Sequence, residues 1–117
     1  LLKSKPLACP RVKRDVQALF HTYGVEPERV HCMGLMAHHN AHLSAYDGID
    51  IALDCWPYAG TATSCEALYM GVPLVTLKGE HHCQNVGASL NNVVGMPELS
   101  ANTTAEYVQI AVALAKD

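Results

Sequence analysis

The stretch that decides the fold runs from residue 49 to residue 79 and reads IDIALDCWPYAGTATSCEALYMGVPLVTLKG. It contains in order an apolar strand pattern, a loop, a helical pattern and a second apolar strand pattern, at residues 49–53, 56–60, 61–70 and 74–77. Gly71 suits the end of the helix, and Gly79 breaks the second strand. The order of strand, helix and strand is typical of a unit with two parallel strands.

The sequence on both sides of this stretch repeats the same alternation. Further strand patterns occur at residues 1–2 and 30–33, and further helical patterns at residues 10–24, 40–46 and 84–90 and after Thr103. Thr103 and Glu106 have the spacing of a capping box, which marks the start of the last helix. We therefore expect an α/β fold with roughly four parallel strands between helices. The prediction is one Rossmann-like domain over residues 1–117.

Composition excludes several classes of protein. Of 117 residues, 50% are hydrophobic and 16% are charged, which excludes intrinsic disorder and suits one packed domain. A net charge of −3 argues against nucleic-acid binding. No apolar run reaches the roughly 18 residues of a membrane span, so neither nucleic acid nor membrane is an expected partner. Because the chain opens on Leu1 rather than methionine, we expect a fragment of a larger protein.

The five cysteines are isolated from one another along the chain. They form no C-x-x-C pair and are odd in number, as Cys9, Cys32, Cys55, Cys65 and Cys83. This is neither a zinc-ribbon pattern nor a disulfide framework. Reduced, mostly buried thiols of an intracellular protein are the simplest interpretation.

Three turns that follow predicted strands are the expected location of function. In open parallel sheets, ligands bind beyond the carboxyl ends of the strands. The turns cover residues 38–42, 56–63 and 78–86, and they hold five of the seven histidines. Trp56 and Tyr58 in the second turn are expected to cover the end of the core rather than to stack on a ligand.

The segment from Gly60 to Glu66 carries the strongest local signal. A glycine lets the backbone approach a ligand, and the start of a helix presents unpaired N–H groups and the positive end of the helix dipole. Together with the hydroxyls of Thr61 and Thr63, this predicts a phosphate or diphosphate site. The alternative is that Thr63 to Glu66 is only a capping box, worth about 1 kcal/mol to the helix.

Sequence motifs for other nucleotide and metal sites are absent. Neither the dinucleotide-binding G-x-G-x-x-G nor the P-loop occurs. His38 and His42 have the i, i+4 spacing of zinc ligands, but no third ligand stands beside them. Asp50 and Asp54 do not form a D-x-D pair that would hold a cation against a diphosphate. We therefore expect no metal, and a histidine that donates to a phosphate or lies exposed in a loop.

Residues 50–73 resemble the catalytic region of the O-GlcNAc transferase and SPINDLY family. The resemblance continues through residues 75–79 and 85–90, and back through residues 2–6 and 29–30. The Tyr58-Ala59-Gly60 and Asn85-Val86-Gly87 segments are more similar to SPINDLY than to the animal enzyme.

The resemblance implies the C-terminal, nucleotide-sugar-binding half of a GT-B glycosyltransferase. The implied reaction is inverting, metal-independent transfer to Ser or Thr of intracellular proteins in the cytoplasm or nucleus. The donor substrate would be UDP-GlcNAc or GDP-fucose, without any further cofactor. Its implied partners are acceptor proteins, the N-terminal catalytic half and upstream tetratricopeptide repeats of the same chain. The catalytic base would lie outside this fragment, and the isolated fragment would be inactive.

The resemblance also implies the site residues. The donor diphosphate would be bound by His42, Gly60, Thr61, Thr63 and Glu66, and the nucleotide base by the Ala37 backbone and the His39 side chain. Ala62 departs from the family's run of threonines, and the animal enzyme has a lysine where His39 stands. A non-catalytic nucleotide-binding or regulatory module is the alternative, followed by a sugar-nucleotide epimerase.

Overall fold

The computed structural model describes residues 1–116. It contains two compact units, Leu1–His42 and Leu43–Asp117, and each unit has its own parallel sheet. The expectation of one domain over residues 1–117 stays a prediction. Within the described residues, no helix has both the length and the apolar character that crossing a membrane requires.

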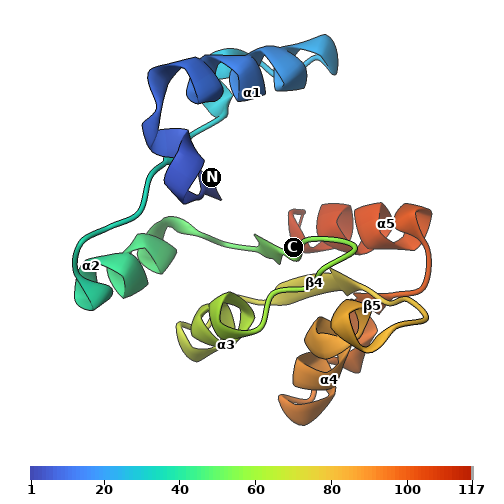
Figure 1. Cartoon of the computed structure of the whole chain (residues 1–117). Coiled ribbons are helices and arrows are strands. Elements are labelled where there is room, and N and C mark those ends of the chain that lie inside the picture. The colour runs from blue at the N-terminus through green and yellow to red at the C-terminus, as the bar shows by residue number, and fades with distance from the viewer. Residues whose placement is uncertain (117) are drawn as a thin grey trace. The chain divides into compact units, whose positions relative to one another are not determined.

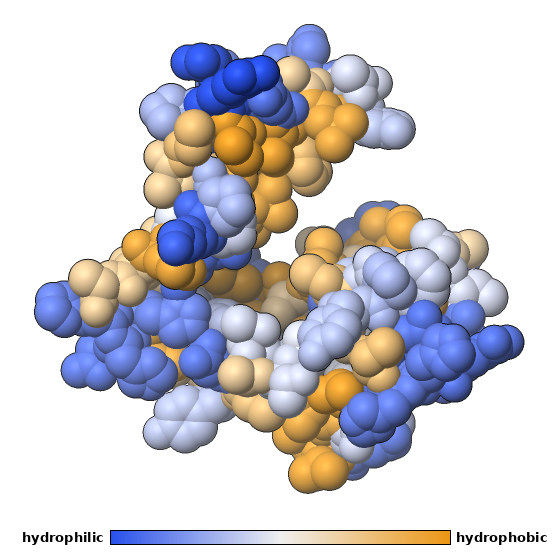
Figure 2. Space-filling view, viewed as in Figure 1, coloured by the Kyte–Doolittle hydropathy of each residue, from blue (hydrophilic) through white to orange (hydrophobic). Residues whose placement is uncertain are grey.

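The first unit is a two-stranded parallel sheet beside one long helix. Strand β1 (Leu2–Lys3) pairs with β2 (Cys32–Met33), and helix α1 (Pro10–Thr22) lies between them in the chain. The side chain of Gln17 donates to the carbonyl oxygens of Pro27 and Val30 at 3.0 and 3.1 Å, which ties α1 to the segment before β2. Figure 2 shows α1 with a hydrophilic and an apolar side. Its apolar residues Leu19 and Phe20 are exposed, and so is Tyr23, which directly follows the helix.

The second unit is a three-stranded parallel sheet with helices on both faces. Helix α2 (His39–Ser44) leads into it from the first unit, and a 3-10 helix over Ala45–Gly48 follows. The remaining helices and strands are β3 (Ala52–Leu53), α3 (Ala62–Tyr69), β4 (Leu74–Leu77), α4 (Val86–Val93), β5 (Ser100–Ala101) and α5 (Thr104–Leu114). The strand order is β3-β4-β5. Helix α5 covers one face of the sheet, and α3 and α4 cover the other (Figure 1).

Strand β4 is the centre of this unit. Leu74, Val75 and Thr76 are buried, since the strand has a neighbour on each edge and helices on each face. Asn91 of α4 is also fully buried, and its amide donates to the carbonyl oxygen of Leu74 at 2.9 Å and to the Ser100 hydroxyl at 3.2 Å. One polar side chain thus joins α4 to β4 and β5.

Helix ends follow the predicted signals. Gly24 and Gly71 both have φ of +80°, a conformation that costs other residues free energy, and α1 and α3 end just before them. At α5, the Thr103 hydroxyl accepts from the Glu106 N–H at 3.1 Å, as a capping box requires. The Glu106 carboxylate bonds the Asn102 N–H at 2.7 Å instead of the Thr103 N–H.

The strands differ from the expectation in extent and number. Strand β4 matches the predicted residues 74–77, whereas β1, β2 and β3 are two-residue strands within or beside the predicted runs. Strand β5 was not predicted, because Ser100 and Ala101 form no apolar run that sequence periodicity could detect.

Candidate functional site

The candidate site is built at the carboxyl ends of β3 and β4. The loop at residues 54–61 joins β3 to α3, and the loop at residues 78–85 joins β4 to α4. These are two of the three predicted turns. The third, residues 38–42, lies in the first unit.

Asp54 organises the loop after β3. Its Oδ1 accepts from the backbone N–H of Cys55 at 3.0 Å and of Gly60 at 2.8 Å, so the carboxylate closes the loop on itself. Its Oδ2 accepts from the Thr76 hydroxyl of β4 at 2.8 Å. Sequence reasoning considered Asp54 only as a possible cation ligand. No local sequence signal identified this role, because the Thr76 partner lies 22 residues away in the chain.

Two glycines let this carboxylate pack closely. A Cβ at Gly60 would lie 2.5 Å from the Ser64 hydroxyl oxygen and 2.9 Å from that of Thr63. A Cβ at Gly87, in the first turn of α4, would lie 2.4 Å from both Asp54 Oδ2 and the Thr76 hydroxyl oxygen. The start of α4 can therefore approach Asp54 this closely only because Gly87 has no side chain, and Gly60 leaves room for the hydroxyl groups of Thr63 and Ser64.

The loop after β4 is also closed by a polar side chain. The Asn85 amide donates to the carbonyl oxygens of Gly79 at 2.8 Å and His81 at 3.0 Å, and it accepts from the Gly79 N–H at 3.2 Å. The Ala59 N–H donates to the carbonyl oxygen of Cys83 at 2.9 Å, which connects the two loops. Hydrogen bonds therefore hold both loops in shape.

The start of α3 presents the predicted diphosphate-binding residues at the surface. The helix begins at Ala62 after Thr61, and both Thr61 and Thr63 are exposed. The first N–H groups of a helix have no carbonyl partner within it and point out of its end. The capping-box interpretation of Thr63 is wrong, because Thr63 lies inside the first turn and the preceding Thr61 makes no side-chain cap.

Glu66 and Tyr46 lie on the same side of this helix start. The Tyr46 hydroxyl donates to the Thr63 carbonyl oxygen at 3.2 Å. Burial, and next the charge of Glu66, raise the pKa of Tyr46 above its ordinary value. Tyr46 therefore keeps its proton and its role as a donor at neutral pH. It is a neighbour of the site that sequence reasoning did not single out.

The aromatic residues of the loop after β3 do not cover the core. Trp56 is 55% exposed and Tyr58 is 75% exposed, so the expectation that they close the end of the core is wrong. Tyr107 of α5, which is half-buried, reaches the end of β3 instead, and its hydroxyl donates to the Asp54 carbonyl oxygen at 3.0 Å. Burial, and then the charges of Asp54 and Cys55, raise the pKa of Tyr107 to about 12.

The other predicted site residues lie in the first unit. His42 is half-buried, and its Nδ1 is hydrogen-bonded to the Lys3 ammonium group. His39 and Ala37 are exposed, and the His39 ring centroid is 6.3 Å from that of His42. Among residues 1–116, no group of three or more His, Cys, Asp or Glu could hold a metal ion.

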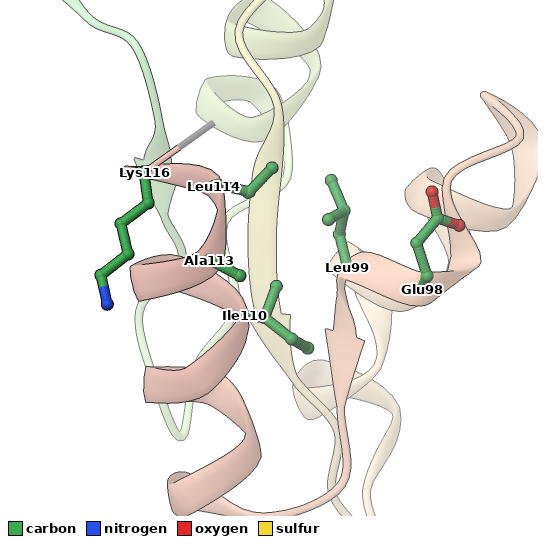
Figure 3. A pocket seen from close by; sticks show the side chains of 6 residues that line it. All are labelled: Glu98, Leu99, Ile110, Ala113, Leu114 and Lys116. Carbon is green, nitrogen blue, oxygen red and sulfur yellow. The ribbon is translucent and has the colours of Figure 1, made fainter.

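A pocket of about 480 Å³ lies at the other end of the strands in the second unit's sheet. Leu99 stands just before β5, so the pocket is at the amino ends of the strands, away from the two loops. Figure 3 shows Glu98 and Lys116 at its two ends, with Leu99, Ile110, Ala113 and Leu114 between them. Apart from those two charged ends the lining is apolar, so the pocket offers little to bind a diphosphate.

Comparison with known proteins identifies the family. The model for glycosyl transferase family 41 matches residues 7–117. The chain belongs to glycosyl transferase family 41. This confirms the resemblance to the O-GlcNAc transferase and SPINDLY family, and with it the expectation of an α/β glycosyltransferase fold with parallel sheets flanked by helices.

Individual members of family 41 are similar over most or all of the chain. The probable UDP-N-acetylglucosamine–peptide N-acetylglucosaminyltransferase SPINDLY of Petunia hybrida is 44% identical over 117 residues, which are 100% of this chain and 13% of the relative. The Caenorhabditis elegans UDP-N-acetylglucosamine–peptide N-acetylglucosaminyltransferase is 34% identical over 80% of this chain and 8% of its own.

Comparison with solved structures also finds a similar glycosyltransferase. The K341M mutant of Thermobaculum terrenum O-GlcNAc transferase, a GT-B enzyme, has a TM-score of 0.93 and 37% identity, and the match covers 99% of this chain and 22% of that one. The chain thus spans a minor part of the length of the family members that it matches.

Proposed function

We propose that this chain is the nucleotide-sugar-binding part of a protein O-glycosyltransferase. In this proposal the whole enzyme transfers GlcNAc from UDP-GlcNAc, or fucose from GDP-fucose, to Ser or Thr of intracellular proteins, with inversion and without a metal. The observation that carries it is the start of α3 beyond the end of a parallel strand, where Gly60 and Thr61 end a loop held by hydrogen bonds and Thr63 lies in the first turn of the helix.

The chemistry of the leaving group explains why such a helix start is useful. When the bond from the sugar to the diphosphate breaks, negative charge gathers on the diphosphate oxygens. N–H groups at a helix start and the threonine hydroxyls are fixed before the reaction, so they stabilise this charge without reorganising. Removing one such donor raises the barrier by about 3 kcal/mol in enzymes that stabilise an oxyanion.

His42 would supply a further donor to the same diphosphate. The Nδ1 of His42 is hydrogen-bonded to the Lys3 side chain, and an imidazole N–H is a donor that a phosphate oxygen can accept. In this proposal the Ala37 backbone and the His39 side chain contact the nucleotide base, and Glu66 lies beside the diphosphate. The catalytic base and the acceptor-binding repeats belong to other parts of the whole enzyme.

Titration calorimetry of the full-length protein with UDP, GDP and NAD tests this proposal. Micromolar binding of UDP or GDP is the expected result, and the tighter of the two names the donor class. Binding of NAD alone would contradict it. Nucleotide binding without any sugar transfer to acceptor proteins would instead support the alternative, a non-catalytic nucleotide-binding module.

A further inference from the structure

We propose that Asp54 is the positioning residue of the donor site. Its carboxylate sets the conformation of the loop that presents Gly60, Thr61 and Thr63. The inference rests on the proposed function, since it assumes that these three residues meet the diphosphate. Asp54 itself would not touch the donor.

The two carboxylate oxygens of Asp54 have different roles. Oδ1 accepts from the N–H groups at both ends of the loop, Cys55 and Gly60. Oδ2 accepts from the Thr76 hydroxyl, on a β4 residue that is 1% exposed. The first oxygen therefore fixes the shape of the loop, and the second anchors the carboxylate to the core. Hydrogen bonds to a charged acceptor are stronger than those between neutral groups.

The surroundings of Asp54 allow it little movement. The Tyr107 hydroxyl donates to the carbonyl oxygen of Asp54 at 3.0 Å. The backbone N–H of Asp54 donates to the carbonyl oxygen of Val75 at 2.9 Å. Gly87 packs so closely that an added Cβ would lie 2.4 Å from Oδ2. Because the backbone of Asp54 and its Oδ2 are both bonded to residues of the core, Asp54 can hold the loop in one conformation. A loop that is rigid before the donor arrives loses less entropy on binding.

Three substitutions in the full-length enzyme separate this role from simple stabilisation. Asp54→Ala removes both oxygens. Asp54→Asn keeps an oxygen for the two loop N–H groups and offers an NH₂ to the Thr76 hydroxyl, which can accept. Thr76→Val removes only the bond between the carboxylate and the core. All three should lower the melting temperature, so stability alone cannot distinguish them.

The dissociation constant for UDP or GDP distinguishes them. We expect it to rise at least tenfold in Asp54→Ala, to stay within about threefold of wild type in Asp54→Asn, and within about twofold in Thr76→Val. Hydrogen–deuterium exchange over residues 55–61 should quicken in Asp54→Ala and not in Asp54→Asn. If Asp54→Ala does not fold, Asp54→Ser takes its place, because a serine side chain is too short to bond both Gly60 and Thr76.

Three results would overturn the inference. Affinity within twofold of wild type in Asp54→Ala, together with a tenfold loss in Thr63→Ala, would reject the role of Asp54 and leave the proposed function standing. Equal losses in Asp54→Asn and Asp54→Ala would reject hydrogen bonding as the cause. If neither Asp54→Ala nor Thr63→Ala lowered the affinity for UDP or GDP, both the proposed diphosphate site and the positioning role of Asp54 would be rejected.

Discussion

At the scale of single residues, two threonines at helix starts have different roles. The Thr103 hydroxyl accepts from the Glu106 N–H at 3.1 Å and caps α5. Thr63 lies inside the first turn of α3, and α3 has no side-chain cap. The two residues belong to similar sequence patterns. Only the position of each threonine relative to the first residue of its helix decides whether its hydroxyl caps the helix or is left for a ligand.

This difference predicts opposite effects of two alanine substitutions. Thr103→Ala should lower the free energy of unfolding by about 1 kcal/mol and leave nucleotide affinity unchanged. Thr63→Ala should weaken UDP or GDP binding roughly tenfold, as expected for a lost hydrogen bond to a charged group, with little loss of stability. Thr63→Ser should keep most of the affinity. Thermal unfolding and calorimetry on the same proteins measure both quantities, and a stability loss without an affinity loss in Thr63→Ala would make Thr63 structural.

His42 is the second prediction at this scale. His42→Ala in the full-length enzyme should lower sugar transfer at least tenfold while the protein stays folded, because a donor to the diphosphate is lost. His21→Ala is the matched control, since His21 is an exposed histidine of α1 outside the predicted turns. Initial rates of transfer to an acceptor protein give the comparison. Activity of His42→Ala within twofold of wild type would reject its assignment.

At the scale of elements, α5 is connected to the end of β3 by one hydroxyl group. Tyr107 lies in α5, and its O–H donates to the Asp54 carbonyl oxygen at 3.0 Å. Its pKa in the folded state is raised to about 12, above the ordinary value of 10.0. A raised pKa means that the folded state holds the proton more tightly than the unfolded state does. This contribution to stability is complete below pH 10 and disappears as pH rises through about 12.

Tyr107→Phe tests this connection through its pH dependence. At pH 7 the substitution should lower the free energy of unfolding by about 1 kcal/mol, the value of one hydrogen bond. The difference between wild type and variant should shrink from pH 10 towards pH 12, because wild type alone loses the contribution. Urea unfolding of both proteins across this range gives the measurement. A difference that does not change with pH would show that the hydroxyl titrates normally.

At the scale of the whole molecule, charge is divided unevenly between the two units. Residues 1–42 contain six Lys and Arg against three Asp and Glu, whereas residues 43–117 contain two against eight. The second unit carries the helix start that we propose for the diphosphate, so its net charge would repel the ligand. Local attraction for the diphosphate must therefore exceed this long-range repulsion. Either N–H groups and an imidazole or a bound cation could supply that attraction.

Chelation decides between these two means of holding the diphosphate. We expect EDTA to leave the transfer rate of the full-length enzyme unchanged, because in the proposed site α3 N–H groups, threonine hydroxyls and His42 would take the place of a cation. The control is the same enzyme with added Mg²⁺ or Mn²⁺. Complete loss of activity on chelation, restored by either cation, would reject the metal-independent mechanism.

The sequence by itself determined the α/β class, the family and most of the elements. Leu74–Leu77 is a buried strand as its apolar run predicts, and Gly24 and Gly71 follow the ends of their helices at positive φ. These features follow from local causes, namely side-chain hydrophobicity and glycine's freedom at positive φ, so they can be predicted one segment at a time.

Tertiary structure alone decided the features that depend on distant residues. Strand β5 is two residues long and exists because it pairs with β4, and the buried Asn91 bonds backbone and side chain on two strands. Asp54 hydrogen-bonds to Thr76, 22 residues away, and to Tyr107, 53 residues away. Which hydrogen-bond partner a carboxylate or an amide finds is set by the packing of the whole unit, and no local pattern encodes it.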